Sequence, residues 1–358
     1  MNNKTLRTVA LLAISFISVV ILLWSNPSLF FIKGVTNGGF QRVKSSGALQ
    51  LLNDYIIDRG EYRIISYKKD TLLIRDLNEG SLIQITGNKK MERIQLNSLF
   101  DPSSIAEIAE NPFNRSSIDV LESNSRRITS YNYGTKKILQ YYVFDSYIDK
   151  AVRTSPDEFF VLKESPETEK LVFSKVMFNK DGTQTHTDSR YFFDALQEDG
   201  VLLNKRNSFF YINYYSNRIF NVTDDLNEKQ YHTIDTIKRL PRIDSLANNT
   251  IIQFSKPPLI VNRMSCIDKD FMYVISNINA DNDNKLPSSD YYIIDTYDIK
   301  NGCSYFETFY VRKKNKELLE DFRVAEKKMV LLFQKSATFY RLIDEIAKQK
   351  SLSKFEVE

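Results

Sequence analysis

The sequence predicts an all-β protein, a six-bladed β-propeller that is preceded by an N-terminal transmembrane helix. Three observations lead to this prediction. An uncharged apolar run follows basic residues at the start of the chain. Aromatic residues, which favour half-buried strands, make up 13% of the composition. Short β-rich segments then recur in groups along most of the chain.

The composition and motifs exclude several classes of protein. Only 2 His and 2 Cys occur among 358 residues, which rules out His-rich metal centres, zinc ribbons, iron–sulfur clusters and disulfide-dense scaffolds. The 49 Lys and Arg nearly balance the 45 Asp and Glu, so the charge does not indicate a nucleic-acid partner. No Gly-x-Ser-x-Gly elbow, phosphate loop or Gly-x-Gly-x-x-Gly fingerprint occurs, so no catalytic residue and no cofactor is predicted.

The first segment, residues 1–34, has the pattern of a retained signal anchor. The uncharged run 8–24 follows Lys4 and Arg7, as in membrane-targeting segments. No small-x-small cleavage site follows it, which favours an anchor over the alternative of a cleaved signal peptide. The nearest basic residues predict that the N-terminus lies inside. We therefore expect a single-pass protein of the cytoplasmic membrane whose bulk is periplasmic or extracellular.

The remaining chain divides into three parts. Residues 35–60 are expected to form a linker and a short helix, with the helix over residues 47–57. The propeller is expected to occupy residues 61–345, and residues 346–358 form a C-terminal tail.

The propeller region repeats one pattern, in which a buried strand, an aromatic strand and a third strand are separated by turns. The groups begin near residues 62, 118, 159, 201, 271 and 329, close to the ~40–50-residue period of propeller blades with insertions in some loops. Radial stacking buries both faces of such sheets and limits their exposed edges. The predicted strands are 63–67, 71–76, 81–85, 118–121, 127–131, 137–144, 158–162, 170–178, 199–203, 208–214, 218–222, 270–275, 291–297, 304–311, 328–333 and 337–343.

In strand order and in its Tyr- and Phe-rich segments, the chain resembles six-bladed propellers of the TolB-like and NHL-like kind. It looks most like the extracytoplasmic propellers of Bacteroidetes-type bacteria. The resemblance covers about residues 60–345 and rests on period and pattern. The chain departs from it in having only 11 Gly, and Asn, Asp, Lys and Ser stand at the predicted turns instead. The alternatives are a pair of β-sandwiches, or a seventh blade made from residues 36–58 or 225–262.

The candidate metal ligands are few. His186 and Asp188 lie two residues apart on a predicted strand, so their side chains share one face and could hold a metal or relay a proton. The other interpretation is a solvent-facing hairpin. Asp281 and Asp283 resemble the start of a calcium loop, but the Gly and Glu that an EF-hand requires at its sixth and twelfth positions are missing. The prediction for this segment is either a calcium site that is not an EF-hand or a polar hairpin loop.

The two cysteines, Cys266 and Cys303, flank the fifth group of strands. Outside the cytoplasm a single pair can oxidise, and an antiparallel hairpin could bring the two together. We predict either a disulfide between them or two reduced, partly buried thiols.

The sequence favours a binding or scaffolding module over an enzyme. The loops of a propeller face would bind a protein or a small-molecule ligand, and the long insertions 225–262 and 278–290 are the candidate surface. The alternative function is a propeller enzyme of the calcium-dependent hydrolase or lactonase type. Three or more carboxylates or amides within reach of a metal at the propeller axis would favour this enzyme.

Overall fold

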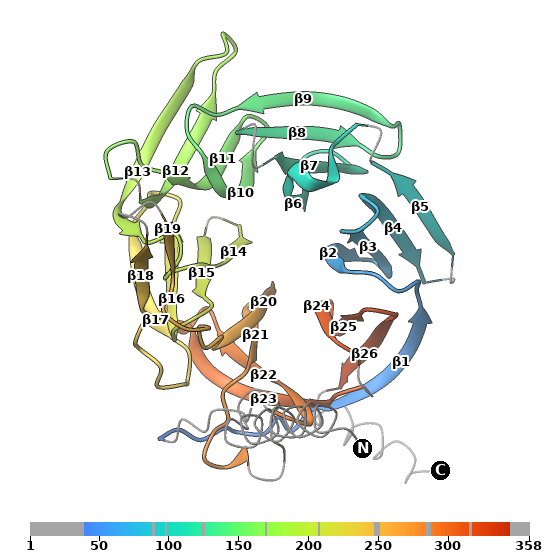
Figure 1. Cartoon of the computed structure of the whole chain (residues 1–358). Helices are drawn as coiled ribbons and strands as arrows, with labels where there is room; N and C mark the ends of the chain where they lie inside the picture. Colours follow the sequence, from blue (N-terminus) through green and yellow to red (C-terminus); the bar gives the residue numbers. More distant parts are fainter. Residues whose placement is uncertain are drawn as a thin grey trace, which may run out of the picture.

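The computed structural model describes residues 39–343, apart from 88–89, 97–98, 123–125, 169, 207, 247–250, 284–285, 287 and 315–316. Six four-stranded antiparallel sheets stand radially around a central axis, which confirms the prediction of an all-β six-bladed propeller. Figure 1 looks down this axis, with β2, β6, β10, β14, β20 and β24 innermost. The predicted transmembrane segment lies outside the described residues. Within the described ranges, no helix has the length and apolar character needed to cross a membrane.

The blades follow one another in chain order. Blade 1 contains β2 (Tyr62–Lys68), β3 (Thr71–Asp76), β4 (Ser81–Thr86) and β5 (Met91–Gln95). A 3-10 turn, Pro102–Ser104, leads to blade 2, which contains β6 (Ile105–Glu110), β7 (Ser117–Glu122), β8 (Arg127–Asn132) and β9 (Lys137–Val143). Blade 3 contains β10 (Ile148–Ser155), β11 (Glu158–Glu164), β12 (Leu171–Phe178) and β13 (Gln184–Phe193). Blade 4 contains β14 (Gly200–Lys205), β15 (Ser208–Asn213), β16 (Arg218–Thr223) and β17 (Glu228–His232).

Blades 5 and 6 complete the ring. Blade 5 contains β20 (Asn262–Asp268), β21 (Phe271–Ser276), β22 (Tyr291–Asp298) and β23 (Ser304–Arg312). Blade 6 contains β24 (Leu319–Ala325), β25 (Lys328–Phe333), β26 (Ser336–Ile343) and, as its outermost strand, β1 (Ala48–Ile56). Each blade begins at its inner strand, so all six inner strands start at the same end of the propeller. We call that end the upper face and the opposite end the lower face.

Strand β1 corrects the prediction of a short helix over residues 47–57. It pairs antiparallel with β26, from Ala48 opposite Ile343 to Ile56 opposite Ser336. A short apolar run is ambiguous between helix and strand, and here the open edge of β26 decides, because it needs a partner for its backbone groups. The N-terminal strand therefore closes the ring, and the propeller begins at residue 48 instead of 61.

The second strand of each blade is buried on both sides. All six residues of β7 are buried, and β3, β15, β21 and β25 each have five buried residues in a row. A strand with blades packed on both faces reads as a continuous apolar run, which is why these strands were recognisable in the sequence. The strands β5, β6, β10, β17, β20 and β24, which mix polar and apolar residues, were not predicted.

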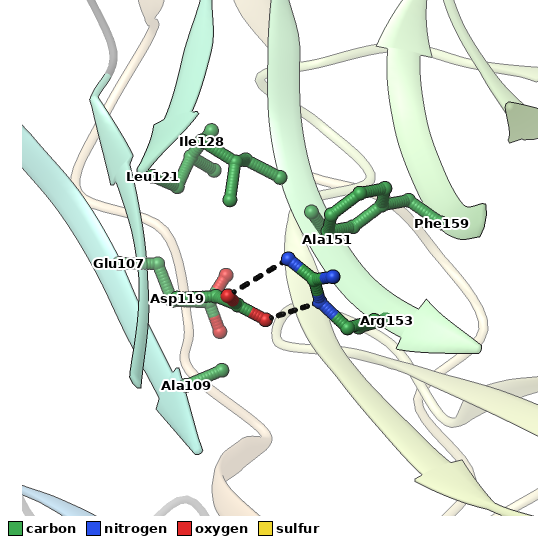
Figure 2. A pocket seen from close by; sticks show the side chains of 8 residues that line it. All are labelled: Glu107, Ala109, Asp119, Leu121, Ile128, Ala151, Arg153 and Phe159. Atoms are coloured by element: carbon green, nitrogen blue, oxygen red, sulfur yellow. Dashed lines mark hydrogen bonds and ion pairs between the residues drawn. The ribbon is translucent and has the colours of Figure 1, made fainter. Parts of the chain in front are cut away.

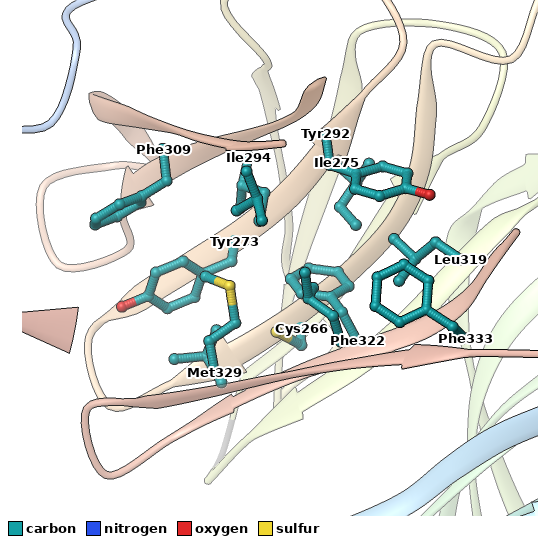
Figure 3. Packing of buried hydrophobic residues seen from close by; sticks show 13 residues of the cluster. Cys266, Tyr273, Ile275, Tyr292, Ile294, Phe309, Leu319, Phe322, Met329 and Phe333 are labelled. Atoms are coloured by element: carbon teal, nitrogen blue, oxygen red, sulfur yellow. The ribbon is translucent and has the colours of Figure 1, made fainter. Parts of the chain in front are cut away.

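The hydrophobic core lies between neighbouring blades. Figure 3 shows the cluster between blades 5 and 6, where Cys266, Phe322 and Phe333 pack together. Between blades 3 and 4, the rings of Phe160 and Phe209 stack with their centroids 3.7 Å apart. Aromatic pairs of this kind join adjacent sheets across the interface, so each blade is stabilised by its neighbours.

Residues other than Gly occupy many of the left-handed turn positions. Lys69 and Asp70, in the turn between β2 and β3, have φ of 47° and 60°, and Glu326 and Lys327 have φ of 52° and 63° in the equivalent turn of blade 6. Positive φ at both central residues matches the twist of a two-residue hairpin. This explains how a propeller forms with 11 Gly.

The alternative architectures are wrong. Residues 36–58 supply the closing strand β1, and the segment 225–262 supplies β17 and a two-stranded hairpin, β18 (Ile243–Leu246) with β19 (Ile251–Phe254). In the part of the chain that the structure describes, neither segment forms a seventh blade, and the sheets do not pair into sandwiches. The predicted tail 346–358 lies outside the described residues.

Candidate functional site

Charged side chains gather where the inner strands begin, at the upper face. We call this group the axial cluster, and its members are Arg63, Glu107, Asp149, Lys150, Asp199, Arg263, Glu320 and Asp321. They belong to five inner strands and to the residue before β14. The cluster therefore draws on every blade, although its members are scattered along the sequence.

β-Bulges in the inner strands set the orientation of several of these side chains. In blades 2, 3, 5 and 6, the pairing register between the first and second strands breaks at the second residue of the inner strand. The extra residues are Ala106, Asp149, Arg263 and Glu320. A bulge bends the strand locally and redirects side chains, and it often occurs beside functional sites.

One side of the axial cluster is built around Lys150. Its Nζ lies 2.8 Å from Asp149 Oδ2 and 3.1 Å from Asp199 Oδ1. Burial by itself would lower the pKa of Lys150, but the charges of Asp149 and Asp199 outweigh burial and raise that pKa above its ordinary value. Lys150 therefore stays protonated, so it can act as a cation but not as a neutral amine nucleophile.

Tyr214 lies between the walls of the axial cluster. Burial raises the pKa of its phenol to about 12. The charges of Lys150, Asp199, Glu107 and Arg63, which lie on four different blades, also act on this phenol. Its backbone N–H donates to the carbonyl of Asp199 at 2.8 Å, which fixes the loop between β15 and β16 at the axis.

An aromatic rim connects the cluster to the insertion 225–262. The ring of Tyr214 lies 6.3 Å from that of Tyr215, which in turn lies 5.3 Å from the ring of Phe254 on β19. Tyr147, just before β10, is 37% exposed on the same face, and its phenol lies in the field of Asp149 and Lys150. The upper face thus offers aromatic surface beside charges of both signs.

The opposite side of the axial cluster carries two guanidinium groups. Arg263 Nη2 donates to the carbonyl of Leu319 at 2.6 Å, and Arg63 Nη1 lies 3.7 Å from Glu320 Oε2. Burial and the nearby charge of Arg63 lower the pKa of Arg263. The charge of Glu320 acts on Arg263 also, and Glu320 Oε1 has no hydrogen-bond partner although Glu320 is only 8% exposed.

The axial cluster holds two further carboxyl groups: Asp321 lies on this side, on β24, and Glu107 lies in the field of Lys150 and Asp149. Asp321 Oδ2 accepts a hydrogen bond of 2.8 Å from the backbone N–H of Ile64, and burial raises the pKa of Asp321. Protein atoms surround Glu107 while its side chain stays accessible to water, and burial raises its pKa also. Both carboxyl groups favour protonation more than they would in water.

A buried ion pair lies directly behind Glu107, between blades 2 and 3 (Figure 2). Arg153 binds Asp119 in a bidentate manner, with Nε to Oδ2 at 2.7 Å and Nη2 to Oδ1 at 3.0 Å. The cavity that these residues line with Glu107 and Phe159 has a volume of about 10 Å³, roughly the space of one water molecule. This pair therefore joins two blades and leaves no room for a ligand.

The axial cluster is suited to binding charged groups. Within the described ranges, no group of three or more His, Cys, Asp or Glu could hold a metal ion. Cations flank the carboxylates, which is an arrangement for fixing a ligand that carries both signs of charge, by charge-assisted hydrogen bonds.

His186 and Asp188 do not come together. His186 Nε2 lies 2.9 Å from Asp145 Oδ2, while Asp188 Oδ1 lies 3.1 Å from Lys163 Nζ. Both predicted residues lie on β13, the outermost strand of blade 3. The partner of His186 comes from the loop before β10, which sequence spacing gave no reason to select.

Asp281 and Asp283 contact the segment before β1. Asp281 Oδ2 accepts from the backbone N–H of Gly39 at 2.9 Å, and Asp283 binds the guanidinium of Arg42. Arg42 also binds Asp295 in a bidentate manner, with contacts of 2.8 and 2.9 Å. Part of the insertion 278–290 is therefore occupied by the chain itself.

The two cysteines are free thiols. Cys266 is on β20 and Cys303 immediately precedes β23, so they lie at the innermost and outermost strands of blade 5. Because neighbouring strands are spaced by about 4.8 Å, the two positions are roughly 14 Å apart, too far for a disulfide. The other predicted state, two reduced thiols, is the one found, and both are almost fully buried.

Comparisons with known proteins agree with the fold. No family model and no curated protein matches the chain. Among solved structures, a member of the duf4221 family from Bacteroides vulgatus is 10% identical, with a TM-score of 0.50 over 86% of this chain and 99% of that chain. A Bacteroides fragilis protein, provisionally described as exported, gives the same values. Virginiamycin B lyase from Staphylococcus aureus is 10% identical, with a TM-score of 0.48 over 83% of this chain and all of that one.

The chain is a six-bladed β-propeller. Its resemblance to propellers of Bacteroides is confirmed at the level of the fold, and an identity of 10% carries no more than the fold. What the protein binds must therefore be argued from its own residues.

Proposed function

We propose that this propeller is a membrane-anchored extracytoplasmic binding module whose ligand site is the axial cluster with its aromatic rim. The observation that carries the proposal is the convergence of charged residues from every blade at the start of the inner strands, several of them placed by bulges. Such a surface fixes a polar ligand or a protein segment by charge, while tyrosines add contact area at low entropic cost.

The proposed location rests on the N-terminus. Basic residues precede the uncharged run 8–24, and no cleavage site follows it. We expect a C-terminal alkaline phosphatase fusion to be active when the chain is made in a bacterial host. An inactive but stable fusion would exclude the proposed topology.

The binding role is tested by site-specific crosslinking in the cells that make the protein. A photoreactive p-benzoyl-phenylalanine replaces Tyr147 on the aromatic rim, and in the matched control it replaces Tyr141, which is 52% exposed on the outer strand β9. We expect a discrete adduct from position 147 and none from position 141. Equal adducts from both positions, or none from 147, would contradict the proposed site.

The propeller enzyme of the calcium-dependent hydrolase type is not part of this proposal. It requires carboxylates that converge on a metal, whereas Asp149 and Asp199 are bound to Lys150 and Asp321 is bound to a backbone N–H group. The propeller enzyme stays a prediction from the sequence. A rise in thermal stability on adding calcium, lost when Asp321 is replaced by Asn, would favour it.

A further inference from the structure

A second candidate site lies on the lower face, between blades 4 and 5. A cavity of about 410 Å³ opens there, at the turn between β14 and β15 and the turn between β22 and β23. We call it the lower pocket, and it is lined by Lys205, Arg206, Phe210, Asn221, Ile299 and Lys300. Its size falls within the usual range for small-molecule sites. It is separated from the axial cluster by the length of the blades.

The lower pocket has an excess of positive charge. Lys205, Arg206 and Lys300 line it, and Asp270 is a carboxylate that contacts both lysines. Asp270 Oδ1 lies 2.8 Å from Lys205 Nζ, and its Oδ2 lies 2.6 Å from Lys300 Nζ. Hydrogen bonds from these two lysines lower the pKa of Asp270 to about 2. Asp270 therefore stays ionised and holds both ammonium groups at the pocket, which leaves a net charge for an anion to neutralise.

Asn221 adds a second and different element. It pairs with Phe210 on one side and Lys229 on the other, so these side chains project from the same face of blade 4. The side-chain oxygen of Asn221 is buried and has no hydrogen-bond partner. A buried acceptor is costly when unpaired, so a ligand that donates a hydrogen bond there would gain affinity.

Other lysine–carboxylate pairs on the lower face show what is distinctive. Lys328 binds Asp70 across blades 6 and 1, and Lys68 lies 2.7 Å from Glu110 across blades 1 and 2. Each pairs one cation with one carboxylate, as expected for contacts that join neighbouring blades. The lower pocket differs because two lysines share one carboxylate, and a third cation, Arg206, lines the same cavity, which also has an unpaired acceptor.

We infer that the lower pocket binds a phosphate monoester that also carries hydroxyl groups, such as a phosphorylated sugar. The phosphate lies against Lys300, Lys205 and Arg206, whose guanidinium fork suits phosphate oxygens. A hydroxyl of the ligand donates to Asn221, and Phe210 and Ile299 form the apolar floor. This site is independent of the axial cluster and of the role proposed for it.

The test is isothermal titration of the full-length protein in a neutral detergent with three probes: glucose 6-phosphate, inorganic phosphate, and glycerophosphoglycerol as a lipid-headgroup analogue. We expect saturable one-to-one binding of glucose 6-phosphate. Lys300→Glu should weaken it at least about tenfold, because a charged hydrogen bond is replaced by repulsion. The matched control Lys328→Glu, which breaks a lower-face pair without a cavity, should change it less than about twofold.

Asn221→Ala separates the two elements of the site. We expect it to weaken glucose 6-phosphate towards the affinity of inorganic phosphate while leaving inorganic phosphate unchanged. Preference for glycerophosphoglycerol, which is a phosphodiester of the lipid-headgroup kind, would overturn the inference of a monoester, and preference for glucose 6-phosphate would support it. The inference is overturned if no probe binds saturably, or if Lys328→Glu weakens binding as much as Lys300→Glu. Far-UV circular dichroism melts check that both variants fold.

Discussion

Arg42 is the residue whose loss should reveal how the ring is closed. It is 3% exposed and lies just before β1, the strand that completes blade 6. Its guanidinium donates to both oxygens of Asp295, to Asp283, to the carbonyl of Ile278 at 2.8 Å and to Ser276 Oγ at 3.0 Å. All five N–H groups of the side chain are thereby used.

Replacing Arg42 by Ala leaves two buried carboxylates, Asp283 and Asp295, without their cation. Breaking a buried ion pair by removing one partner costs about 3–5 kcal/mol. At roughly 2–4 °C per kcal/mol for a domain of this size, the midpoint of thermal unfolding should fall by about 6–20 °C. The loss should also weaken the β1–β26 pairing, because Arg42 ties the chain before β1 to blade 5.

The assay is urea unfolding of the full-length chain followed by far-UV circular dichroism. The matched control is Arg190→Ala, because Arg190 is an exposed arginine on the outer strand β13 and should change the free energy of unfolding by less than about 0.5 kcal/mol. A loss below about 1 kcal/mol for Arg42→Ala would refute the reasoning. A second variant, Arg42→Met with Asp283→Asn and Asp295→Asn, should lose less than Arg42→Ala, because no uncompensated charge remains.

Three further predictions follow from single positions. Gly200→Ala should destabilise the chain by at least about 2 kcal/mol in urea unfolding, because the added Cβ would overlap a backbone carbonyl of β15; an unchanged midpoint would contradict this. Burial raises the pKa of Glu107 above its ordinary 4.5, so the native chain binds a proton more tightly than the unfolded one. The stability that this provides is present below pH 4.5 and lost as the pH rises through the raised value. Glu107→Gln should therefore gain stability over the wild type from about pH 5 upward and not below pH 4, and a difference independent of pH would count against it. Burial raises the pKa of Cys266 and of Cys303 to about 12, so Ellman's reagent at pH 8 should label neither thiol in the native chain and both in 8 M urea; labelling of the native chain would show that the thiols are accessible.

The propeller could be predicted because one strand of every blade carries its own signal. A second strand such as β11 or β21 is covered by blades on both faces, so its residues are apolar without interruption and β-favouring. The recurrence of such strands gives the approximate period of the blades. In the outer strands, side chains alternate between the core and water, and in the inner strands they alternate between the core and the axis. Because these strands mix polar and apolar residues, most of the inner strands could not be recognised from the sequence.

The candidate sites could not be predicted in the same way. Each member of the axial cluster is one charged residue near the start of an unremarkable strand, and nothing within ten residues of Lys150 announces Asp199 or Arg263. The sequence offered one signal for the axial cluster, which is that a charged residue recurs in the segment before each buried second strand. The contacts of the metal candidates could not be predicted for the matching reason, because Asp145, which contacts His186, and Gly39, which contacts Asp281, are far away in the sequence.

The sequence by itself determined the composition of the buried layers, the turn positions and the periodicity, because these depend on each residue's own preference for water and backbone conformation. Only the tertiary structure decided that residues 48–56 are a strand, that Arg42 lies between two buried aspartates, and that the ring has six blades instead of seven. Those outcomes depend on how the propeller ring closes. A free edge on β26 and an unpaired charge on blade 5 exist only once the ring has formed, and the N-terminal segment satisfies both.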